Sequence, residues 1–229
     1  MQNAILIIAH KNKEQLIRLI KILNDKDFDI YIHLDKKWKL SLEEINDIKF
    51  SSSNVKIINK RISGFLDTWS LCQITIELAK EAFKKNKNYH YFLLLSGQDY
   101  PIKPIKDIKK YLKNVYPKPI IDCTPMTKEN WIYSGFRWIR IHPYYRFVEK
   151  ISKNKICRKV LLLPIYFIQV IITFILQSPY KRLSRENCSL YGGSAWWILP
   201  NEIVGNCIKE VENNTKIVRA FKLKNTPEE

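Results

Sequence analysis

The sequence predicts an α/β protein with a mostly parallel sheet flanked by helices, and three observations favour this class. Apolar runs without alternation, such as Ala4 to Ala9 and Tyr91 to Leu95, are typical of strands covered on both faces. Segments with helical spacing of apolar residues alternate with these runs, which predicts parallel strands joined by right-handed crossovers. A length of 229 residues suits one such domain, residues 1–229.

The predicted elements follow one another closely in the first half, residues 1–125. The strands expected there, in chain order, are Ala4–Ala9, Phe28–Leu34, Val55–Ile58, Tyr91–Leu95 and Ile120–Cys123. The helices expected between them, each with apolar residues three or four positions apart, are Lys13–Leu23, Leu42–Ile48, Trp69–Phe83 and Ile105–Leu112. Pro101 and Pro104 set the start of the last helix.

Polar loops follow four of these strands and would converge on one edge of the sheet. They contain His10, then Asp35 in the HLDKK sequence, then Arg61, and finally the turn Ser96, Gly97, Gln98 and Asp99. Because ligands of open α/β sheets bind at the carboxyl ends of the strands, we expect the site here. The alternative for the last loop is a plain turn, since its residues suit tight backbone geometry. Neither a G-x-G-x-x-G nor a P-loop pattern occurs in the sequence.

The second half, residues 126–229, differs from the first in composition. The segment 131–145 is dense in aromatics and arginines, which suits either an acceptor site or a lid on the sheet. Val160 to Leu176, the hydrophobic segment 160–176, is an uncharged 17-residue span with basic flanks, near the lower limit for crossing a bilayer. A single crossing would separate two halves of one site, so a helix in the membrane surface is favoured, with a buried helix as the alternative. A further helix is expected over Glu202–Val211.

The charge balance is strongly basic, with 39 Lys and Arg against 22 Asp and Glu, a net charge of +17. This favours an anionic partner, either a nucleic acid, an acidic membrane or a phosphorylated small molecule, although a lysine-rich composition alone gives the same excess. Five scattered cysteines without a C-x-x-C pair predict reduced thiols in a cytoplasmic protein. The apolar N-terminal run is predicted to be a first strand and not a signal peptide.

Five motifs together resemble one known family: HLDKK, TWSLCQITIELAKEAF, LLLSGQDYPIKP, YGGSAWWILP and a terminal TPEE. In order and spacing the chain is similar to glycosyltransferase family 14, the core-2/I-branching β-1,6-N-acetylglucosaminyltransferases and peptide O-xylosyltransferases, including bacterial members. The LSGQDYPIK and YGGSAWW sequences are its most specific parts.

The resemblance implies a GT-A-like, Rossmann-type fold and an inverting, metal-independent enzyme without a cofactor. Such an enzyme moves GlcNAc or xylose from a UDP-sugar to an acceptor hydroxyl, here in bacterial surface polysaccharide or glycolipid synthesis at the inner face of the cell membrane. Its general base falls on Glu229. The implied donor-binding residues, in the half 1–125, are His10, Asp35, Arg61, Ser96, Gly97, Gln98 and Asp99. The implied acceptor-binding residues, centred on the half 126–229, are Asp122, Trp131, Gly193, Ser194, Trp196 and Trp197.

Two departures from the family pattern stand out. In the family, the Arg or Lys that neutralises the leaving diphosphate lies well beyond the base, whereas this sequence ends at Glu229, so the resemblance implies a domain lacking its C-terminal part. The loop Ile62–Thr68 also stands where many bacterial relatives of the family have a Trp-Gly-Gly-like turn.

Three other interpretations compete with this one. His33 and Asp35, with a later histidine, have the form of a non-haem iron triad, although such triads belong to antiparallel barrels. Asp27-Phe28-Asp29 has the D-x-D form of manganese-dependent transferases, but it precedes a strand and is expected to be a solvated turn. The non-enzymatic alternative is a basic peripheral membrane or nucleic-acid-binding module; a nucleic-acid partner is not expected for the transferase.

Overall fold

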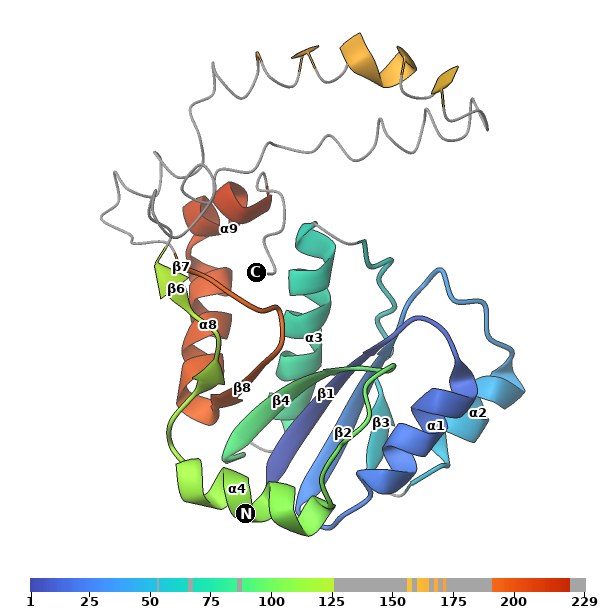
Figure 1. Cartoon of the computed structure of the whole chain (residues 1–229), viewed down its shortest axis with the longest axis vertical. Helices are drawn as coiled ribbons and strands as arrows, with labels where there is room; N and C mark the ends of the chain where they lie inside the picture. The colour runs from blue at the N-terminus through green and yellow to red at the C-terminus, as the bar shows by residue number, and fades with distance from the viewer. Residues whose placement is uncertain are drawn as a thin grey trace.

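A six-stranded sheet forms the centre of the protein (Figure 1). The computed structural model describes residues 1–52, 54–65, 68–85, 88–125, 156–157, 160–164, 167–168, 171 and 191–222. The strands are β1 (Asn3–Ala9), β2 (Phe28–Leu34), β3 (Val55–Ile57), β4 (Tyr91–Ser96), β5 (Ile120–Ile121), β6 (Thr124–Pro125), β7 (Tyr191–Gly192) and β8 (Trp197–Pro200). The helices are α1 (Lys13–Ile22), α2 (Leu42–Lys49), α3 (Trp69–Lys85), α4 (Ile105–Val115), α8 (Asn201–Asn213) and α9 (Thr215–Lys222).

The strand order of the sheet is β3-β2-β1-β4-β8-β5. The first four strands are parallel, with Ile5 opposite both Ile30 of β2 and Leu93 of β4. The strand β8 then pairs antiparallel with β4 on one side and β5 on the other. The predicted class, a mostly parallel sheet flanked by helices, is therefore confirmed.

Helices cover both faces of this sheet (Figure 1). On one face, α1, α2 and α4 bury apolar residues such as Leu19, Ile48 and Leu112 against the strands. On the other, α3 and α8 contribute Ile74, Leu78 and Val204 to a second core. The continuous apolar strands follow from this arrangement, because both faces of β1 and β4 are shielded from water.

The carboxyl ends of β1, β2 and β4 are drawn together by backbone contacts. The N–H of Asp35 donates to the carbonyl of Ala9 at 2.8 Å, and the N–H of Gly97 donates to that of Ile8 at 2.9 Å. A Cβ on Gly97 would lie only 2.9 Å from the Ala9 Cβ, so glycine is required for this approach. The edge on which the polar loops were predicted to meet is thus closely packed.

At the opposite end of the strands, one prediction is wrong. Asp27 and Asp29 do not form a solvated turn: Asp27 pairs with Lys109 and the N-terminus, and Asp29 is buried. The Asp29 carboxylate accepts from the Tyr89 hydroxyl and the Lys85 ammonium, both at 2.7 Å. Burial is the largest single influence and opposes ionisation, but the hydrogen bonds and the charge of Lys85 together outweigh it and lower the pKa of Asp29. Both aspartates anchor the end of the sheet away from the polar loops.

Candidate functional site

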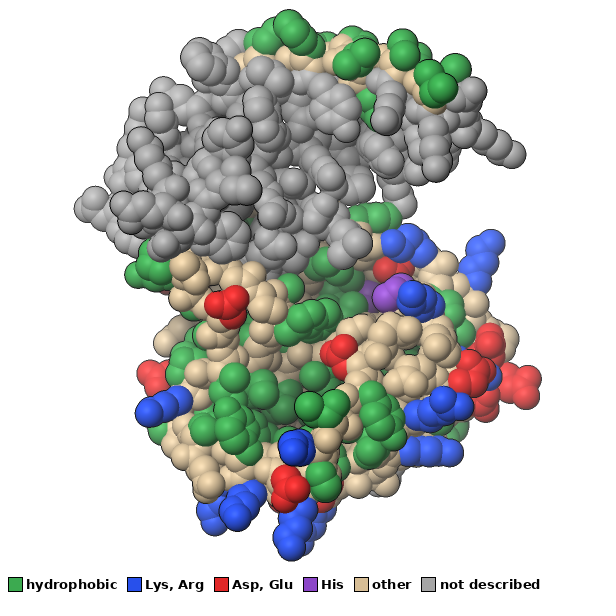
Figure 2. Space-filling view, viewed as in Figure 1, with side chains coloured by type: hydrophobic (Ala, Val, Ile, Leu, Met, Phe, Trp, Pro, Cys, Tyr) green, Lys and Arg blue, Asp and Glu red, His purple; other side chains and the backbone are tan. Residues whose placement is uncertain are grey.

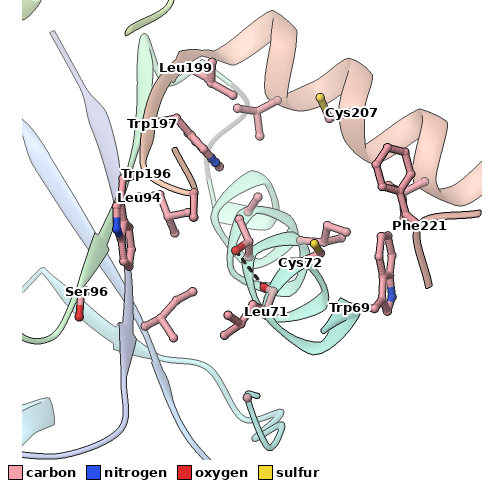
Figure 3. Close-up of a pocket in the computed structure, with 18 of the residues that line it drawn as sticks. Trp69, Leu71, Cys72, Leu94, Ser96, Trp196, Trp197, Leu199, Cys207 and Phe221 are labelled. Atoms are coloured by element: carbon pink, nitrogen blue, oxygen red, sulfur yellow. Dashed lines mark hydrogen bonds between the residues drawn. The ribbon is translucent and has the colours of Figure 1, made fainter. Parts of the chain in front are cut away.

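A cavity of about 1260 Å³ lies at the carboxyl edge of the sheet, between the strand ends and the helices α3, α8 and α9. One wall is polar and is formed by the ends of β1, β2 and β4. The other is apolar and is formed by side chains of the helices (Figure 3). The segment 193–197, which leads into β8, joins the two walls.

Seven of the residues singled out from the sequence line this cavity together. They are His10, Asp35, Ser96, Gly193, Ser194, Trp196 and Trp197. The parallel sheet brings the first three together at its edge, and the antiparallel pairing of β8 with β4 brings in the other four. Trp196, which is 46% exposed, lies on the side of Ser96 (Figure 3). Predicted donor and acceptor residues therefore share one cavity.

The remaining residues of the SGQD turn support the wall without lining the cavity. The Asp99 carboxylate accepts from the Ser96 N–H at 2.8 Å and closes the turn. The Gln98 side chain donates to the carbonyl of Lys11 at 3.1 Å, and that of Gln15 donates to the carbonyl of Asp99 at 3.3 Å. These bonds fasten the turn to the beginning of α1 and hold Ser96 toward the cavity.

Arg61 is also absent from the cavity lining. Its guanidinium donates to the carbonyls of Leu34 at 3.1 Å and Asp35 at 2.8 Å, and to that of Trp38. A guanidinium has five N–H donors in a fixed fork, which suits it to bridging several carbonyls. Arg61 therefore shapes the loop after β2.

Asp35 lies at the cavity but is only 4% exposed. Its Oδ1 accepts from the Lys37 N–H at 2.7 Å, and its Oδ2 accepts from the Gly64 N–H at 2.9 Å. A Cβ on Gly64 would lie 3.1 Å from the same Oδ2. The carboxylate thus holds the loop after β2 against the loop 61–65.

His33 is completely buried behind that wall. Its Nε2 accepts from the Ile62 N–H at 2.9 Å, and burial lowers the pKa of the ring to about 4, so the imidazole is neutral. With His33 and Asp35 each engaged by backbone N–H groups, the iron-triad alternative loses its ligand pair. In the described part of the chain, no three His, Cys, Asp or Glu side chains come together as a metal site requires.

Of the two remaining predicted acceptor residues, the structure describes only Asp122. Asp122 is exposed and lies outside the cavity. Its backbone carbonyl packs against Gly193 so closely that a Cβ on Gly193 would lie 1.8 Å from the carbonyl oxygen. Only glycine fits at position 193, directly after β7, which pairs with β6. Trp131 and the predicted base Glu229 lie outside the described residues.

Several lining residues were not predicted. Lys37 extends the polar wall, and Phe65 lines the cavity beside it. Trp69 and Phe221 lie on the far side of the cavity from Ser96 (Figure 3). The signal for Lys37 was present in the HLDKK motif, two positions after Asp35. Trp69 was marked in the same way by the TWSLCQITIELAKEAF motif, whereas Phe221 carried no comparable signal, because its position depends on how α9 packs.

The segment 160–176 is described in part, at 160–164, 167–168 and 171. Val160, Leu163, Phe167 and Ile171, spaced as on one helical face, are 46–72% exposed, while Leu162 is 6% exposed. Figure 2 shows apolar side chains along this outer edge, whereas Lys and Arg are dispersed over the sheet-bearing body. Among the described residues, no helix has the length and apolar character needed to span a bilayer.

Comparison with known proteins gives one nearly complete match. The family model described as Core-2/I-Branching enzyme matches residues 4–228. A xylosyltransferase of Ciona intestinalis is 26% identical over 127 residues, covering 56% of this chain and 15% of the relative. A human β-1,3-galactosyl-O-glycosyl-glycoprotein β-1,6-N-acetylglucosaminyltransferase is 30% identical over 108 residues, covering 47% of this chain and 25% of the relative.

The chain thus spans a quarter or less of the length of these two curated relatives. Among solved structures, Staphylococcus aureus TarS 1–349 in complex with UDP aligns with a TM-score of 0.38 and 16% identity. That alignment covers 55% of this chain and 35% of TarS.

Proposed function

The chain belongs to the Core-2/I-Branching enzyme family, and on that premise we propose that it is a glycosyltransferase that uses a UDP-sugar donor. The observation that carries the proposal is the cavity at the carboxyl ends of β1, β2 and β4. There His10, Asp35 and Ser96 from the predicted donor set lie with Ser194 and Trp196 from the predicted acceptor set. Donor and acceptor must meet in one place for a direct transfer, and this cavity brings residues of both predicted sets together.

The proposed reaction is an inverting transfer to an acceptor hydroxyl. A hydroxyl is a weak nucleophile, so a carboxylate must take its proton while the oxygen attacks the anomeric carbon from the face opposite UDP. The family resemblance assigns that role to Glu229. The bond from the anomeric carbon to the diphosphate oxygen breaks, and UDP leaves with the bonding electrons. The exposed ring of Trp196 suits stacking against a sugar.

Metal independence is part of the proposal and rests on the resemblance. The donated sugar is GlcNAc or xylose, the sugars named for the two relatives described above. The test is UDP release from UDP-GlcNAc and UDP-xylose in the presence of EDTA, with unmodified protein and Glu229→Gln. We expect release with at least one donor, and a loss of 10²-fold or more in the variant. Release that needs a divalent metal, or full activity in the variant, contradicts the mechanism.

The acceptor is proposed to be a glycan or a glycolipid of a bacterial surface, modified at the inner face of the cell membrane. The exposed apolar side chains at 160–171 and the net charge of +17 support association with an anionic lipid surface. Flotation with vesicles of neutral or anionic lipid tests this. Binding to anionic vesicles that is lost in Phe167→Glu is expected. Equal binding by that variant, or no binding at all, contradicts the surface assignment.

A further inference from the structure

We propose that Lys37 binds the diphosphate of the nucleotide donor. This assignment rests on the proposed function and adds to it the group that meets the donor's negative charge. A departing diphosphate gains charge as the glycosidic bond breaks, and without a metal it needs an Arg or Lys within hydrogen-bonding distance. Lys37 lies on the polar wall, two positions after the predicted donor residue Asp35.

Lys37 is the only Lys or Arg among the described residues that line the cavity. Arg61, the other cation predicted for the donor site, donates to three backbone carbonyls and does not line the cavity. The Lys37 side chain is 44% exposed, so an anion can reach it. The described cavity therefore offers one ammonium group to an anionic ligand.

The ammonium of Lys37 is held in place before any ligand arrives. It donates to the carbonyl of Gly64 and lies 4.0 Å from the ring centroid of Phe65. The Lys37 backbone N–H is bound by Asp35, which also fixes Gly64. One carboxylate therefore positions both the lysine and the carbonyl that orients its ammonium.

Asp35 does not use up the lysine's hydrogen-bonding capacity. The distance from the Lys37 Nζ to the Asp35 Oδ2 is 3.7 Å, which is an ion pair and too long for a hydrogen bond. Both Asp35 oxygens already accept from backbone N–H groups. An ammonium has three N–H donors, and one goes to Gly64, so two remain for phosphate oxygens.

The test compares ligands that differ only in phosphate. UDP, UMP and uridine are titrated in EDTA against unmodified protein, Lys37→Met and Lys37→Arg, with direct calorimetry for UDP and competition for the weaker ligands. Methionine keeps an apolar stem beside Phe65 and removes the charge. Lys36→Met is the matched control, because Lys36 is exposed and does not line the cavity. Thermal melts establish that each variant is folded.

We expect Lys37→Met to reduce UDP affinity by about 10- to 100-fold, the usual effect of losing a charged hydrogen bond. Uridine affinity stays unchanged, so the gain in affinity from uridine to UDP shrinks. Lys37→Arg restores most of that gain, and Lys36→Met behaves as unmodified protein.

Two results overturn the assignment while leaving the proposed function intact. In both, unmodified protein binds UDP. In the first, Lys37→Met leaves the affinities for uridine and UDP unchanged, and in the second it weakens both by the same factor. The second pattern makes Lys37 a support of the loop 61–65. If unmodified protein binds neither nucleotide, the proposed function itself fails, and the assignment of Lys37 fails with it.

Discussion

At the scale of single residues, the buried imidazole of His33 couples the stability of the polar wall to pH. Its pKa is about 4 in the folded protein, against an ordinary value near 6.5, and the first cause is burial. The unfolded chain binds a proton more readily than the folded one between these two values. The stabilisation from the neutral ring is therefore fully present above about pH 6.5 and is lost as the pH falls toward 4.

The size of this effect is about 3 kcal/mol for the whole window. Urea unfolding at pH 7.5, 6 and 5 measures it, and His33→Gln is the matched variant, since an amide oxygen can accept from the Ile62 N–H without titrating. We predict that unmodified protein loses more stability on acidification than His33→Gln does. Equal losses in the two proteins would show that His33 does not carry the effect.

Residues of the site could be predicted from the sequence where a motif marked them, but their individual tasks could not. HLDKK pointed to Asp35, yet two backbone N–H groups bind its carboxylate, and Lys37 presents the accessible charge. Arg61 likewise belonged to the correct loop, and its guanidinium contacts backbone carbonyls. Which atoms a side chain meets depends on tertiary contacts between distant loops, and a local pattern does not contain that information.

At the scale of elements, the site depends on how closely β1 and β4 approach at their carboxyl ends. Gly97→Ala would place a Cβ 2.9 Å from the Ala9 Cβ, closer than real Cβ contacts, so the two strand ends must separate. We predict a loss of about 1–3 kcal/mol in the free energy of unfolding, as for other overpacked positions. Weaker UDP binding should accompany it, because Ser96 moves with the strand.

Gly205→Ala is the control for this substitution. Gly205 lies within α8, and a Cβ there would meet the Phe83 ring at 3.7 Å, an ordinary contact. Alanine in a helix is favoured over glycine by about 0.5–1 kcal/mol, so this variant should be more stable than the unmodified protein. Chemical denaturation measures the free energy of unfolding of both variants. If Gly97→Ala is as stable as Gly205→Ala, the strand ends are not tightly packed.

The elements themselves were predicted where periodicity was strong. The four parallel strands lie where the apolar runs placed them, and α1, α2, α3 and α4 begin at the predicted residues. The strand predicted over Ile120–Cys123 is shorter in the structure, where β5 covers Ile120–Ile121. The strand β8 was not predicted. Four residues ending in proline carry too little pattern, and β8 is defined by its pairing with β4 and β5. The helix α9 was also missed.

At the scale of the whole molecule, the sheet and its helices gather residues from positions 8 to 221 around one cavity. The motifs that carried the family resemblance, HLDKK, LSGQDYPIK and YGGSAWW, each contribute to its lining. The proposed transfer requires this convergence, because a donor and an acceptor must be held against each other. The family match over residues 4–228 agrees with it.

The most direct test of this account is calorimetric titration of the protein with UDP in the presence of EDTA, with GDP as the comparison ligand. We predict metal-free binding of UDP, much weaker binding of GDP, and loss of UDP binding when Ser96 is replaced by tryptophan to fill the cavity. Absence of UDP binding, or binding that the Ser96→Trp variant retains in full, would contradict the central claim that this cavity holds a uridine nucleotide.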